Sequence, residues 1–242
     1  MIRPLIWKEW HEQRWKLAFG TVMLASCTWS ALAARMATDS EVIIAAWIFG
    51  ALVLSWYSAM GVFAPEIAAK TITFLSSKPV GSWKVFFCKW FFGWLNFAVP
   101  TLVCCLGLAV SVLARPQGRY FNIEFIARGT CVAICVGTVF YTMTCCLAPR
   151  KSGEALTGFV GLMILLAMFI HTFLLEFAFF QVNALVKFGF FGKIAFFVNP
   201  LSGINFIEPS REFSSACLYF AEQIVLLLLC LWLGIRKWQR SS

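Results

Sequence analysis

The chain has 242 residues, of which 61% are hydrophobic and 13% are charged, and it carries a formal net charge of +9. Soluble globular domains are about half apolar and about a quarter charged, so this composition, with a mean hydropathy of +0.81, excludes an ordinary soluble protein and predicts a membrane protein. The basic residues flank apolar runs and form no basic domain. They therefore predict contact with lipid headgroups and no nucleic-acid partner.

Residues 1–16 combine Trp7, Trp10 and Trp15 with four cations. Apolar residues such as Ile6 and Trp10 alternate with charged ones at helical spacing, which predicts an interfacial helix that lies flat in the membrane surface. The alternative is a plain juxtamembrane tail. No cleavable-signal pattern precedes the first apolar run, so that run is expected to be retained.

Six apolar runs are each long enough to cross a hydrocarbon core of about 30 Å as a helix of about 20 residues. They cover residues 17–36, 42–64, 90–113, 128–147, 155–175 and 216–235. Unpaired backbone is too costly in lipid, and no run alternates with the period of a strand, so helices are expected. The predicted fold class is one all-α integral membrane domain of six transmembrane helices, in which the ten cysteines act mostly as small hydrophobic residues.

The distribution of cations predicts the orientation. With the N-terminus inside, the inner segments hold 13 of the 20 Lys and Arg residues and the outer segments hold 7. Cytoplasmic loops carry the excess of such residues. The sequence therefore predicts a multi-pass protein of the plasma (inner) membrane with both termini in the cytoplasm.

The inner segment at residues 63–89 carries one acid among four lysines: Glu66 against Lys70, Lys78, Lys84 and Lys89. Residues 66–75 are expected to form a short amphipathic helix that ends at Lys78-Pro79, because a proline disfavours helical geometry at the residue before it. A short helix across the mouth of two spans is placed to receive force from a soluble partner. The alternative is a basic loop held against lipid headgroups.

Residues 176–215 are too aromatic for a solvated loop, and Gly189, Gly192, Pro200 and Gly203 interrupt them too often for one span. They are expected to form short helices that re-enter the outer leaflet between the fifth and sixth spans. Residues 216–242 then supply the last span and a cytoplasmic tail.

Four polar residues near the outer side are candidates for a transport path: Glu222, Gln223, Glu176 and His171. An acid inside a span is costly and is usually functional or paired. The alternatives are that Glu222 reaches the outer interface and that His171 is hydrogen-bonded to a neighbouring helix.

Two motifs resemble those of type-2 ATP-binding-cassette (ABC) export permeases. The inner loop of that family has an acid, a leucine pair, a Pro-Val and a later lysine, which match Phe63, Glu66, Leu75, Pro79-Val80 and Lys89. The chain departs from the pattern where it has Phe74 in place of a leucine and Ala68-Ala69-Lys70-Thr71 in place of a turn-forming stretch. Asn199-Pro200-Leu201 followed by Arg211 is similar to the signature between spans five and six, and the family also begins with a flat "elbow" helix.

The resemblance implies that two permease subunits, identical or different, pair around an export path. Separate ABC ATPase subunits would drive export by pressing on the inner loop, with Glu66, Lys70, Leu75, Lys78 and Pro79 as the coupling residues. No G-x-x-x-x-G-K-[ST] loop occurs in the sequence, so ATP is expected on the partner, and this chain is expected to hold no cofactor and to catalyse no reaction.

The many phenylalanines favour a hydrophobic or amphipathic cargo. The first alternative function is a membrane anchor or signalling component that transports nothing. The second is export of an ion or metal, with Met143 and several cysteines as soft ligands for copper(I). Adjacent cysteines on a helix point about 100° apart, so neither Cys104-Cys105 nor Cys145-Cys146 makes a chelating site by itself, and no metal site is predicted.

Overall fold

A computed structural model describes residues 2–33, 40–68, 82–114, 123–147, 154–182, 198–206 and 213–239. They form six α-helices and one short 3-10 helix: α1 (Ile2–Ala33), α2 (Ser40–Ala68), α4 (Ser82–Ala114), α5 (Ile123–Leu147), α6 (Glu154–Val182), η1 (Pro200–Phe206) and α8 (Phe213–Gln239). Every regular element in these ranges is helical, which confirms the predicted all-α class.

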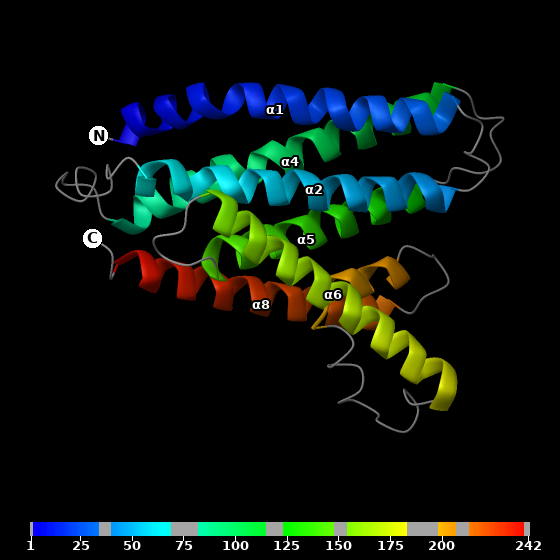
Figure 1. The fold of residues 1–242 in the computed structure, drawn as a ribbon. Coiled ribbons are helices and arrows are strands. Elements are labelled where there is room, and N and C mark those ends of the chain that lie inside the picture. Colours follow the sequence, from blue (N-terminus) through cyan, green and yellow to red (C-terminus); the bar gives the residue numbers. More distant parts are fainter. Residues whose placement is uncertain are drawn as a thin grey trace.

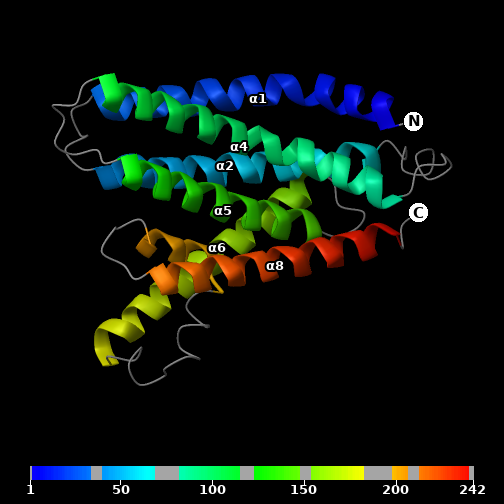
Figure 2. The ribbon, with the colours of Figure 1, turned by 180° about the vertical axis from the view of Figure 1, so that it is seen from behind.

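The long helices form two layers, in which successive helices run in opposite directions (Figure 1). Helices α1, α2 and α6 form one layer, and α4, α5 and α8 form the other, which faces the viewer in Figure 2. Helix α6 crosses the bundle obliquely. Helices α1 and α4 begin, and α2 and α8 end, at the same end of the bundle (Figure 1), which we call the terminal end.

Tryptophan side chains join neighbouring helices through their indole N–H groups. Trp47 donates to Thr28 Oγ1 at 3.0 Å, and Trp56 donates to the carbonyl of Gly158 at 2.8 Å. Within a membrane the hydrophobic effect does not drive helices together, so close packing and such bonds carry the association.

Close packing is visible at Gly93, in the middle of α4. A Cβ atom built on this glycine would collide with the Tyr141 hydroxyl and the Val62 side chain. Only hydrogen fits there, so the glycine allows α2, α4 and α5 to approach one another around the buried Phe97 and Tyr141 rings.

The bundle is apolar outside and partly polar inside. Large apolar side chains are more than half exposed on its surface, among them Phe159, Phe173, Leu228 and Leu229, whereas Asn96, Thr142 and Gln223 are buried. This inverts the pattern of soluble proteins. Four helical stretches are long and apolar enough to cross a membrane: Trp83–Val110, Ile123–Leu147, Glu154–Leu174 and Ala216–Lys237. The chain is therefore a multi-pass membrane protein.

The flat N-terminal helix was predicted wrongly. Residues 2–33 form one continuous helix, with no break near residue 16, so the first turns extend the helix that follows them and do not lie across it. The physical reason is that Glu9 and Gln13, on these turns, are buried against partners on α4. Helix α4 likewise begins at Ser82, eight residues before the predicted span.

Candidate functional site

Two buried polar pairs join α1 to α4 near the terminal end of the bundle. Lys89 Nζ donates to Glu9 Oε1 at 2.7 Å, and both side chains are 2% exposed. Asn96 Nδ2 donates to Gln13 Oε1 at 2.8 Å. We call these four residues the α1–α4 clamp.

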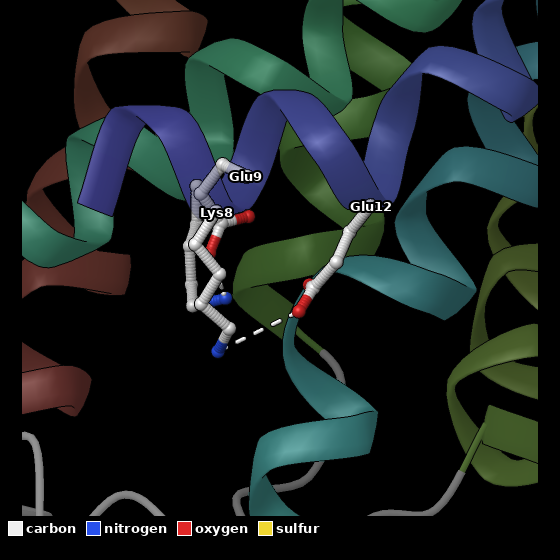
Figure 3. A network of polar contacts seen from close by, with 4 residues as sticks. Lys8, Glu9 and Glu12 are labelled. Atoms are coloured by element: carbon white, nitrogen blue, oxygen red, sulfur yellow. Dashed lines mark hydrogen bonds and ion pairs between the residues drawn. The ribbon is translucent and has the colours of Figure 1, made fainter. Parts of the chain in front are cut away.

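The clamp differs from the other charged pair on the same turns of α1. Lys8 and Glu12 lie one turn apart on the bundle surface, with Nζ and Oε1 3.7 Å apart, and Figure 3 shows them beside Glu9. An exposed pair of this kind contributes about 0–1 kcal/mol. Removing one partner of a buried pair costs about 3–5 kcal/mol, because the remaining charge stays buried and uncompensated.

Helix α4 is also hydrogen-bonded on its other side, to α5. Trp90 Nε1 donates to Thr142 Oγ1 at 3.1 Å, Trp94 Nε1 donates to Thr138 Oγ1 at 2.8 Å, and the Tyr141 hydroxyl donates to the carbonyl of Trp90 at 3.0 Å. Helices α1, α4 and α5 are thus linked by directional bonds as well as by apolar contact.

A second polar cluster lies around Asn199, between α6 and α8. Asn199 Nδ2 donates to the Met168 carbonyl and to Thr172 Oγ1, both at 2.7 Å, and it lies 3.3 Å from His171 Nδ1. Asn199 Oδ1 accepts from the backbone N–H of Leu201 at 3.1 Å. The Leu201 bond fixes the amide orientation, so Nδ2 faces α6, and its two N–H groups are taken by the Met168 carbonyl and Thr172 Oγ1.

The cluster continues to α8 through Pro200. The Tyr219 hydroxyl donates to the Pro200 carbonyl at 2.7 Å, and Tyr219 is fully buried. A Cβ atom on Gly203 would collide with the same hydroxyl, so glycine is required where η1 meets this ring. The Asn199-Pro200 motif therefore joins η1 to α6 and to α8, and we call it, with its partners, the Asn199 cluster.

The candidate path residues lie in and next to this cluster. His171 belongs to it through Asn199. Gln223 is buried one turn beyond Tyr219 on α8, and the adjacent Glu222 is partly exposed, with a buried Oε2 atom that has no hydrogen-bond partner among the described residues. Glu176 lies on α6, and its side chain is outside the described part of the chain.

The predicted coupling residues lie mostly outside the described ranges. Glu66 is in the last turn of α2, which ends at Ala68, so it continues a long helix where a separate short helix was expected to begin. Lys70, Leu75, Lys78 and Pro79 lie outside the described residues, as does Arg211. Helix α2 ends and α4 begins at the terminal end (Figure 1), and Lys89 of the clamp lies seven residues after the first residue of α4.

Of the soft ligands weighed for copper, Met143 packs against Cys146 and Cys230 in one apolar cluster of the part of the chain that the structure describes. No three His, Cys, Asp or Glu side chains there come close enough to hold a metal ion. Cys104, Cys146 and Cys230 are buried free thiols within apolar clusters.

Sequence reasoning missed Glu9 and Gln13. Both stood among polar residues that were assigned to a lipid headgroup surface, and Lys89 was interpreted as an inner cation and as the last residue of the inner-loop motif. One signal was available in the sequence. Glu9 and Gln13 are one helical turn apart, so they lie on the same face of the helix, and this polar face is unfavourable for contact with lipid.

The fold and these two clusters define a multi-pass, all-helical membrane protein with buried polar links between its helices. Searches of protein-family models and of curated proteins return no match to this chain.

Proposed function

We propose that the chain is the permease subunit of an ABC exporter. Two such subunits, identical or different, form the path for a hydrophobic or amphipathic substrate, and separate ATPase subunits supply the energy. All six long helices span the membrane in this proposal, with η1 on the outer side.

One observation carries the proposal: the α2–α4 connection leads directly into α4, whose Lys89 belongs to the α1–α4 clamp. The motif from Glu66 to Lys89 resembles the ATPase-coupling loop of the family. Its last residue, Lys89, is bonded to Glu9 inside the bundle. Force on this connection therefore has a rigid route into the transmembrane helices.

Aromatic and basic side chains support a membrane interface at the terminal end. Lys84 Nζ lies 5.5 Å from the centre of the Trp83 ring, and the Arg236 guanidinium lies 3.8 Å from the centre of the Trp232 ring. Tryptophan is typical of the headgroup region, and an excess of cations is typical of its cytoplasmic side. Together with the excess of inner cations, they favour cytoplasmic termini and contact with anionic lipid of the plasma membrane.

The test measures ATP hydrolysis. The tagged chain is purified in detergent from its own membrane with the ATP-hydrolysing subunits that accompany it, and wild type is compared with Glu66→Ala and Glu66→Lys. Loss of hydrolysis in both variants, with the charge reversal more severe, is expected because the acid lies where the partner docks. Glu124→Ala is the matched control, since Glu124 is an exposed acid on α5 that forms an ion pair with Arg128 one turn away.

Three results would contradict the proposal. Hydrolysis that is indifferent to both Glu66 changes would remove the coupling role. Cysteine labelling that places residue 70 outside the cell would show that the topology is the reverse of the one proposed. Purification that never recovers an ATPase would favour the alternative of a non-transporting membrane anchor.

A further inference from the structure

The clamp opposes sliding of α1 along α4. Glu9 and Lys89 are in contact and are both almost completely buried. A slip of one helical turn, about 5.4 Å, would separate the two buried charges from each other. Apolar surfaces lose much less on sliding, because each lost dispersion contact is replaced by another with the next side chain.

The second polar pair opposes rotation. Gln13 follows Glu9 by one turn of α1, whereas Asn96 follows Lys89 by about two turns of α4. The two bonds thus fix two separate points on each helix. A rotation about either point would break the bond at the other.

A third close approach lies further along the same interface. Pro100 has no N–H group to donate to the Asn96 carbonyl. Gly20 of α1 lies over this carbonyl, and a Cβ atom there would be 3.2 Å from its oxygen. The two backbones therefore meet closely where α4 has lost a helical hydrogen bond.

From this geometry we infer that Glu9 and Lys89 are positioning residues that lock the register of α1 against α4. A displacement of the α2–α4 connection then moves α1 together with α4 and, through Trp90 and Trp94, with α5. The role in coupling rests on the proposed function, whereas the lock itself is a property of two helices and can be measured without a partner.

The test compares two variants that change the buried charges with a control that changes an exposed pair. Glu9→Gln/Lys89→Met removes both charges at nearly constant volume, and Glu9→Lys/Lys89→Glu restores a pair in the opposite sense. Lys8→Met/Glu12→Gln is the matched control, because it removes the exposed pair on the same turns. Spin labels at Phe19→Cys on α1 and Leu102→Cys on α4, both on the bundle surface, report the distance distribution between the helices after the exposed Cys27, Cys131 and Cys217 are replaced by Ala.

We expect the neutral double variant to fold and to show a broader distance distribution than wild type, because neutral side chains can slide. The control and the charge-swapped variant keep the narrow distribution. Lys89→Met alone leaves Glu9 unpaired and shifts the unfolding equilibrium by more than about a hundredfold.

A neutral variant as narrow as wild type would overturn the lock. If the neutral variant fails to fold, a folded charge-swapped variant with a broad distribution would overturn it as well. With the ATPase present, full coupling of hydrolysis to transport in the neutral variant would show that Glu9 and Lys89 have no role in coupling. A wild-type chain that associates with no ATPase would contradict the proposed function, and the distance data would still decide the lock.

Discussion

Replacing Asn199 with alanine tests how firmly η1 is held to the bundle. The substitution removes two bonds that Nδ2 donates at 2.7 Å, to the Met168 carbonyl and to Thr172 Oγ1. It also removes the acceptor of the Leu201 N–H, which lies 3.1 Å from Asn199 Oδ1. Three bonds of one buried side chain are lost together.

The expected loss follows from these bonds. Side-chain hydrogen bonds between membrane helices are worth about 0.6 kcal/mol each, and a buried N–H left without an acceptor costs about 1–3 kcal/mol. The sum is about 2–4 kcal/mol. For a chain of this length each kcal/mol lowers the melting temperature by about 2–4 °C, so a decrease of about 5–15 °C is expected.

Thermal unfolding of the detergent-purified protein, followed by tryptophan fluorescence, measures this effect. Asn199→Asp is expected to be at least as destabilising, because it keeps Oδ1 and turns a second oxygen toward the Met168 carbonyl. Ser202→Ala is the milder control, since it removes the bond that Ser202 Oγ donates to the Asn199 carbonyl at 2.7 Å. If Asn199→Ala melts like wild type, the Asn199 cluster does not hold η1 to α6.

Two further predictions concern the packing of α4 and the proposed path. Gly93→Ala is expected to cost about 1–3 kcal/mol of stability and to lower the melting temperature, because the added methyl group meets Tyr141 and Val62. Gly107→Ala is expected to be neutral or stabilising, since no neighbouring atom lies within 4 Å of its Cβ position. Equal melting temperatures of the two variants would contradict this account. Glu222→Gln is expected to lower substrate efflux and leave the melting temperature unchanged, and unchanged efflux would place Glu222 outside the path.

The positions of the helices could be predicted well from hydropathy, but their ends could not. The runs at residues 128–147 and 216–235 lie within α5 (Ile123–Leu147) and α8 (Phe213–Gln239). The predicted run in α4 begins only at residue 90 because Lys84 and Lys89 interrupt the apolar sequence before it. The stretch of α4 that is long and apolar enough to cross a membrane begins at Trp83 and includes both lysines.

The partner of a buried polar residue could not be read from the sequence. Glu9 and Lys89 are 80 residues apart, and which acid meets which lysine depends on the angle and register at which α1 crosses α4. Asn199 was singled out by resemblance alone, and its bonds to Met168 and Thr172 became visible only when η1 was placed between α6 and α8.

The sequence by itself determined that the chain is helical and resides in a membrane, because composition and the length of apolar runs act locally along the chain. The tertiary structure decided that the first turns continue α1, that Lys89 is a buried partner of Glu9, and that Asn199 links two helices. These features depend on contacts between segments that are distant in the sequence. Burying a polar group without a partner is costly in a medium without water, so the stable packing is the one in which each buried polar group has a partner.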